Sequence, residues 1–162
     1  MPGKPLGYWP EVCFFKAHPV GKKRNPVREK VLLVEDNLGL VEIVQKYLTI
    51  LGYEVSVATT GTQGIRMAIE QVPDLVILDI MLPEVDGFEV ASRIRRHPEI
   101  CFLPILAITA STDFRTKIKA QAAGCDAFFQ KPFTIGRLAN AIDKLLKVEG
   151  MKHSLPPLTW KS

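Results

Sequence analysis

The sequence is poor in the residues that build metal centres and covalent cross-links. Its 162 residues include three cysteines and three histidines. The cysteines (Cys13, Cys101 and Cys125) are odd in number and form no CxxC pair, and the histidines follow no ligand spacing. These absences argue against a disulfide framework and a zinc site, and they favour reduced thiols in a cytoplasmic protein.

Long apolar runs are also absent. The longest, such as Leu75–Leu78, span only a few residues, whereas a transmembrane helix needs about 20. The N-terminal segment has scattered charges and five prolines but lacks the apolar core of a secretory signal. We therefore expect neither a membrane span nor a membrane partner.

Charge is distributed unevenly along the chain. The formal net charge of +4 belongs to the first 29 residues, because residues 30–162 carry equal numbers of basic and acidic side chains. We predict an irregular basic arm over residues 1–28, one folded domain over 29–148 and a tail over 149–162. The tail is too short for a DNA-binding or enzymatic module, so we expect a stand-alone domain without a DNA partner.

Five apolar segments alternate with helical patterns in the predicted domain. Continuous apolar strands are typical of a parallel sheet that helices cover on both faces. Right-handed crossovers then favour a flavodoxin-like, doubly wound α/β fold with five strands in the order 2-1-3-4-5. The expected strands are 31–34, 54–58, 75–78, 103–108 and 126–130, and the expected helices are 40–51, 60–71, 87–97, 113–123 and 135–145.

Polar side chains close four of the five strands. Because the carboxyl ends of parallel strands share one edge of a sheet, these side chains should converge. Gathered carboxylates repel one another unless a cation lies among them, and oxygen ligands suit Mg²⁺. A lysine and a threonine suit a phosphoryl group, which a carboxylate can accept. The residues are Glu35 and Asp36 after the first strand, then Asp79, Thr109 and Lys131 at the third, fourth and fifth.

These segments resemble the receiver domains of two-component response regulators, in particular the stand-alone regulators of chemotaxis. The resemblance covers about residues 29–148 and includes all the polar strand ends in order. It implies a phosphorelay switch that catalyses only its own phosphorylation and dephosphorylation, and not an enzyme with a separate substrate. The matching segments are residues 31–37, 75–83 with Asp86-Gly87, 108–110 and 129–133.

The resemblance also implies how a phosphoryl group and a metal would be held. Asp79 would accept the phosphoryl group from a phosphohistidine on a sensor histidine kinase or a histidine phosphotransfer protein. Asp36 would ligate Mg²⁺ directly, and Glu35 would help through water. Asp79 and the backbone carbonyl of Met81 would be the other protein ligands. Asn37 can cap the following helix, which leaves the acidic pair for the metal.

Three further positions would transmit the signal if the resemblance holds. Lys131 would pair with the acceptor and then with the phosphoryl oxygens, and its peptide bond to Pro132 would be cis. Thr109 would rotate inward to bond the phosphoryl group. Phe128 would be the switching aromatic, although an aromatic there fits a static core equally well. The face formed by residues 113–123, 126–130 and the last helix would contact a downstream protein, and pairing of two copies there stays open.

Other functions fit parts of this pattern. A phosphorylation-independent interaction module on the same fold would bind its partner equally well after Asp79→Asn. A Mg²⁺-dependent phosphohydrolase would need a second acid near the nucleophile, where Met81 stands. A flavin carrier is suggested by the fold alone, and the acidic strand ends would repel its phosphate.

Overall fold

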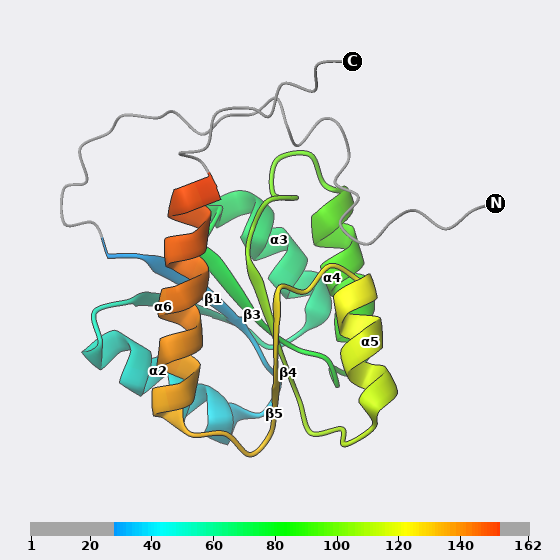
Figure 1. Cartoon of the computed structure of the whole chain (residues 1–162), viewed down its shortest axis with the longest axis horizontal. Coiled ribbons are helices and arrows are strands. Elements are labelled where there is room, and N and C mark those ends of the chain that lie inside the picture. Colours follow the sequence, from blue (N-terminus) through cyan, green and yellow to red (C-terminus); the bar gives the residue numbers. More distant parts are fainter. Residues whose placement is uncertain (1–27, 153–162) are drawn as a thin grey trace.

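A computed structural model of the protein describes residues 28–152, with side chains to residue 147. Within this range, five parallel strands form one sheet in the order β2-β1-β3-β4-β5, and helices cover both of its faces (Figure 1). The predicted fold and strand order are therefore confirmed. The strands are β1 (Lys30–Val34), β2 (Glu54–Ala58), β3 (Leu75–Asp79), β4 (Ile105–Thr109) and β5 (Ala127–Gln130), and the helices are α2 (Leu38–Ile50), α3 (Gly61–Gln71), α4 (Gly87–Arg96), α5 (Phe114–Ala122) and α6 (Ile135–Lys152).

Two apolar layers fill the space between the sheet and its helices. Alternate residues of a strand enter opposite layers, so Leu32 of β1 packs with α3 and α4 while Leu33 packs with α2 and α6. Helix α5 lies on the same face as α4. Every residue of β3 and β4 is buried. The sheet is thus a rigid support for the side chains at the carboxyl ends of its strands.

Side-chain caps fix where the helices begin. Asn37 Oδ1 accepts a hydrogen bond from Leu40 N at 3.1 Å, so the predicted cap of α2 is confirmed. Thr60, Asp86 and Asp113 cap α3, α4 and α5 in the same way. Each cap satisfies one backbone N–H that a helix start leaves without an intrahelical acceptor.

Several element boundaries differ from the predictions, and two of the differences have a clear cause or extent. Strand β4 begins at Ile105 and not at residue 103, because Pro104 has no N–H to give to a ladder. Helix α6 continues to Lys152, beyond the predicted helix end at 145 and past residue 148. Gly150 does not end it, since a helix tolerates an interior glycine at a cost of about 1 kcal/mol.

The membrane and thiol predictions have different outcomes. Among residues 28–152, no helix is long and apolar enough to cross a membrane. Among the described residues Cys125 is a free cysteine. Cys13 lies outside the described residues, so the prediction that all three thiols are reduced stays a prediction.

Candidate functional site

Three polar side chains are buried at the carboxyl edge of the sheet, and all three were selected from the sequence. Glu35 and Thr109 have no exposed surface, and Asp79 is 3% exposed. They lie at the ends of β1, β4 and β3, which are neighbours in the sheet. Because burial of ionised carboxylates is unfavourable without compensation, each must have partners at this edge.

Lys131, directly after β5, supplies the positive charge. Its ammonium donates to Glu35 Oε2 at 2.8 Å and to Asp79 Oδ2 at 3.0 Å. The peptide bond between Lys131 and Pro132 is cis, as predicted. Backbone groups bind the other carboxylate oxygens: Asn37 N donates to Glu35 Oε1 at 3.0 Å, and Met81 N donates to Asp79 Oδ1 at 2.8 Å.

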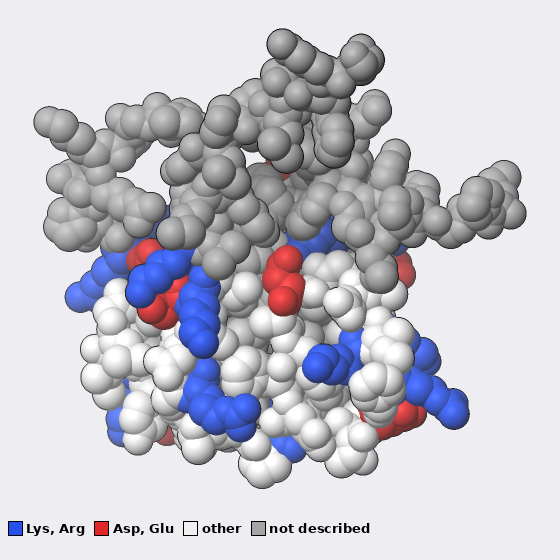
Figure 2. Space-filling model, viewed as in Figure 1, with Lys and Arg blue, Asp and Glu red and all other residues white. Residues whose placement is uncertain are grey.

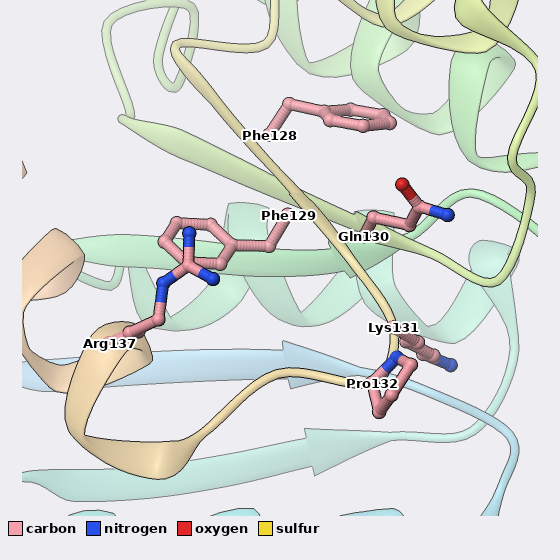
Figure 3. Close-up of a pocket in the computed structure, with 6 residues that line it drawn as sticks. All are labelled: Phe128, Phe129, Gln130, Lys131, Pro132 and Arg137. Atoms are coloured by element: carbon pink, nitrogen blue, oxygen red, sulfur yellow. The ribbon is translucent and has the colours of Figure 1, made fainter.

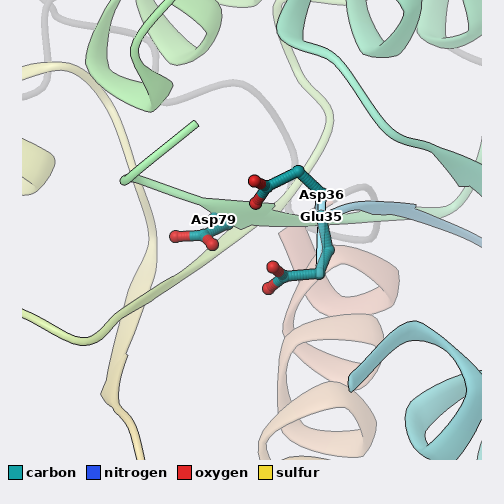
Figure 4. Close-up of side chains that lie close together, drawn as sticks. All are labelled: Glu35, Asp36 and Asp79. Carbon is teal, nitrogen blue, oxygen red and sulfur yellow. The ribbon is translucent and has the colours of Figure 1, made fainter. Parts of the chain in front are cut away.

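Asp36 completes an acidic cluster beside this pair. One carboxylate oxygen from each of Glu35, Asp36 and Asp79 lies within 4.8 Å of the others. Both side chains from the end of β1 point toward Asp79 at the end of β3 (Figure 4). Unlike the other two, Asp36 is exposed, and so is the side chain of Met81. Three carboxylates against one ammonium leave an excess negative charge that a divalent cation would balance.

The burial of the cluster perturbs its ionisation. Burial raises the pKa of Glu35, and the hydrogen bonds from Lys131 and from the Asn37 N–H offset part of that rise. Burial alone would lower the pKa of Lys131, but its hydrogen bonds with Glu35 and Asp79 outweigh that effect and raise it. Lys131 is therefore charged at neutral pH.

The backbone of α4 approaches the end of β3 closely at Gly87. A Cβ there would lie 2.5 Å from the carbonyl oxygen of Asp79 and 2.5 Å from the Cα of Ile80, far inside van der Waals contact. Gly87 N also donates to Ile80 O at 3.0 Å. Glycine is therefore required at this position if the loop after Asp79 is to fold back on its strand.

Thr109 and Phe128 occupy neighbouring strands. Thr109 Oγ1 accepts a hydrogen bond from Ser111 N at 3.1 Å and makes none with Asp79. Phe128 is half-buried against Ile80, Ala107 and Ala120. The two side chains are near the site but are not part of its charged cluster, so their assignment as switch residues stays a prediction.

The edge strand β5 carries a hollow that sequence patterns did not indicate. A volume of about 370 Å³ is lined by both phenylalanines of β5, Lys131 and Arg137 among others. Phe128 and Phe129 point to opposite sides of the strand, and the Arg137 guanidinium of α6 lies 5.7 Å from the centre of the Phe129 ring (Figure 3). The i, i+8 spacing of Phe129 and Arg137 crosses two elements, so no sequence period connects them.

Comparisons with known proteins agree with this geometry. The family model for the response regulator receiver domain matches residues 31–143. Two curated relatives are the DNA-binding dual master transcriptional regulator RpaA of Synechocystis sp., 34% identical over 77% of this chain, and the transcriptional regulatory protein AfsQ1 of Streptomyces coelicolor, 36% identical over 82%. The chain covers only 54% and 57% of their lengths.

Solved structures show the same similarity. The chemotaxis response regulator CheY4 of Vibrio cholerae is 29% identical with a TM-score of 0.70, over 74% of this chain and 99% of that chain. The receiver domain of a Pseudomonas aeruginosa sensor histidine kinase is also 29% identical, with a TM-score of 0.70, over 75% of this chain and 99% of that one. That domain was solved with a magnesium ion coordinated in its active-site cleft.

The relatives overturn one expectation. We expected no DNA partner, yet relatives that share this domain are DNA-binding and transcriptional regulators. The physical reason for the error is that a receiver domain holds the input chemistry alone and carries no record of the output it controls. The site chemistry, the fold and the match over residues 31–143 lead to one conclusion: the chain belongs to the response regulator receiver domain family of two-component signalling.

Proposed function

We propose that this domain is a phosphoacceptor switch in which Asp79 takes a phosphoryl group from a phosphohistidine. The observation that carries the proposal is the placement of the Asp79 carboxylate, which is almost fully buried and held at both oxygens. Met81 N binds Oδ1 and the Lys131 ammonium binds Oδ2. A nucleophile fixed in this way needs little reorganisation for in-line attack on phosphorus.

The transfer balances without another reactant. A carboxylate oxygen of Asp79 forms a new bond to phosphorus while the bond between phosphorus and the histidine nitrogen breaks. The other ring nitrogen of the phosphohistidine carries a proton, so the ring leaves as a neutral imidazole when it keeps the electron pair of the broken bond. Lys131 stays charged throughout and neutralises the oxygens of the phosphoryl group as they pass.

The residues present fit a magnesium ion. The donors are oxygens only, their carboxylates carry excess negative charge, and Asp36 is exposed with its carboxylate toward the cluster. We propose that Asp36, Asp79 and the Met81 carbonyl hold Mg²⁺, with Glu35 acting through water. When bound, the ion would neutralise phosphoryl charge during the transfer. The chain's own contribution is to keep Glu35 paired with Lys131, so that this carboxylate does not repel the incoming group.

Phosphorylation would then add close to two negative charges and three acceptor oxygens beside Thr109. We propose that the Thr109 hydroxyl turns toward these oxygens and that Phe128 follows on the adjacent strand. Thr109 is fully buried, and Phe128 packs against the small residues Ala107 and Ala120. Space beside an alanine is what a rotating aromatic ring requires.

The wider role follows from the same site. The phosphoryl donor would be a sensor histidine kinase or a histidine phosphotransfer protein, and the location would be the cytoplasm, where kinases take phosphate from ATP. The similarity to the DNA-binding regulator RpaA supports DNA as a target of the output that this domain controls. The folded unit would span residues 29–148, and its catalysis would be limited to its own phosphorylation and dephosphorylation.

Intact mass after incubation with acetyl phosphate and Mg²⁺ tests the proposal. We expect one phosphoryl adduct on the wild type, which chelation of Mg²⁺ prevents. Asp79→Asn should carry none, and Asp143→Asn, a matched change on the exposed surface of α6, should carry the adduct as the wild type does. An adduct of equal yield on Asp79→Asn would contradict the assignment of the acceptor, and no adduct on any variant would contradict the switch itself.

A further inference from the structure

A series of hydrogen bonds connects Thr109 with the first turn of α5. Ser111 N donates to Thr109 Oγ1 at 3.1 Å, and the hydroxyls of Ser111 and Thr116 are bonded at 2.9 Å. Asp113 N donates to the same Ser111 hydroxyl at 3.2 Å. Ser111 therefore binds the proposed switch threonine through its backbone and α5 through its side chain.

Helix α5 is held more loosely than its neighbour α4. It buries one residue, Ala120, whereas α4 buries four. Phe114 and Ile118 of α5 are 72% and 51% exposed. Lysine and arginine side chains lie on either side of an uncharged surface on the right of the face shown in Figure 2, where α5 lies in Figure 1. Because few apolar contacts oppose a shift of α5, a change in the hydrogen bonds at its start has a large effect on its position.

We propose that Ser111 and Thr116 are positioning residues that transmit the state of Asp79 to α5. This inference rests on the proposed function. Thr109 has a single side-chain oxygen, which now accepts from Ser111 N. If that oxygen turns toward a phosphoryl group, the Ser111 N–H loses its acceptor and the loop must adjust.

The bonded hydroxyls of Ser111 and Thr116 determine which element moves with the loop. Strand β4 is fully buried and cannot follow the loop. The Ser111 side chain is bonded to Thr116 Oγ1 and to the N–H of Asp113, whose carboxylate caps α5 through Arg115 N at 2.9 Å. A displacement of Ser111 therefore reaches the first turn of the loosely held helix, and not the strand.

Amide hydrogen exchange over residues 114–122 tests the coupling, measured with and without acetyl phosphate and Mg²⁺ on full-length protein. Intact mass of the same samples gives the phosphorylated fraction. We expect phosphorylation to change exchange in α5 of the wild type. The change should be lost in Thr116→Val and in Ser111→Ala, and the double variant should be no worse than either single one. Thr112→Val, an exposed threonine of the same loop, is the matched control and should keep the wild-type change.

Thr116→Ser keeps the hydroxyl and should restore the response, which separates loss of the bond from general damage to the helix. An adduct on Thr116→Val together with an undiminished change in α5 would overturn the inference and leave the proposed function intact. Loss of the response in Thr112→Val as well would also overturn it, because the effect would then not depend on the hydroxyl pair. No adduct on the wild type would remove the proposed function, and this inference with it.

Discussion

At the carboxyl edge of the sheet Lys131 faces Glu35 and Asp79, and at the amino edge Arg95 faces Asp126. Both cations are largely buried, with side chains 21% and 12% exposed. The Arg95 guanidinium donates to Asp126 Oδ2 at 2.8 Å and also to three backbone carbonyls, those of Gly124, Cys101 and Leu103, at 2.6–3.0 Å. At the carboxyl edge, the Lys131 ammonium donates to the carboxylates of Glu35 and Asp79 and to no backbone carbonyl among the described residues.

The difference separates structure from function. Among the described residues of the amino edge, the Arg95 guanidinium meets one carboxylate. Its rigid fork also binds backbone carbonyls that lie just before β4 and β5, so the arginine links both strands to α4. At the carboxyl edge a single ammonium is shared by two carboxylates, and a third stands beside them. A balanced cluster holds the fold together, while an unbalanced one keeps charge available for a ligand.

Removal of Arg95 should have the largest effect on stability. Arg95→Met leaves three carbonyls without their donor and Asp126 without its positive partner, although Ile105 N still donates to Asp126 Oδ2 at 2.8 Å. We expect it to lower the free energy of unfolding by about 3 kcal/mol. Urea unfolding measures this. Arg93→Met, in the same helix, is the control, because the Arg93 and Glu89 side chains are 50% and 44% exposed and solvent screens their pair.

The comparison fails if Arg95→Met is no more destabilising than Arg93→Met. It is sharpened if folded Arg95→Met still takes one phosphoryl group on Asp79. In that case the two clusters are independent, as their separation at opposite edges of the sheet suggests, and the arginine serves the architecture alone.

The same substitution should act with opposite sign at the two edges. Asp79→Asn removes one of three clustered negative charges, so without Mg²⁺ we expect it to raise the free energy of unfolding by about 1 kcal/mol. Asp126→Asn should lower it, because the charge that pairs with Arg95 is lost. Urea unfolding in the presence of a chelator measures both. Mg²⁺ should stabilise the wild type by mass action and reduce the advantage of Asp79→Asn. A destabilised Asp79→Asn would show that the cluster is balanced without metal.

The sequence predicted the carboxyl edge well because strand ends are visible in it. Apolar runs mark where the strands stop, and in a parallel sheet each polar residue at such a stop reaches the same edge. The sequence did not indicate that Glu35 is fully buried and bound to Lys131. Burial of that kind depends on how closely β1 and β5 bring their ends together, which periodicity does not encode.

The amino edge could not be predicted in the same way. Arg95 binds carbonyls of residues 101, 103 and 124, and a carbonyl belongs to every residue type, so no motif marks these acceptors. The hydroxyl pair of Ser111 and Thr116 has the same character, because two common residues five positions apart form no recognised pattern. Output partners were missed for a different reason: they are a property of the whole regulator and not of its receiver domain.

The smallest expected signal comes from Cys125, which lies between Gly124 and Asp126 at the amino edge. Burial raises the pKa of its thiol to about 12, while Arg95 lowers it and Asp126 raises it by lesser amounts. At pH 8 the native thiol is therefore protonated and should resist iodoacetamide, since the thiolate is the nucleophile. Alkylation then requires opening of this edge, so mass analysis of the Cys125 peptide should show faster modification in Arg95→Met and no change in Arg93→Met. Equal rates in the wild type, Arg95→Met and Arg93→Met would mean that iodoacetamide reaches the thiol without breaking the Arg95 cluster. The amino edge would then not be the more rigid of the two edges.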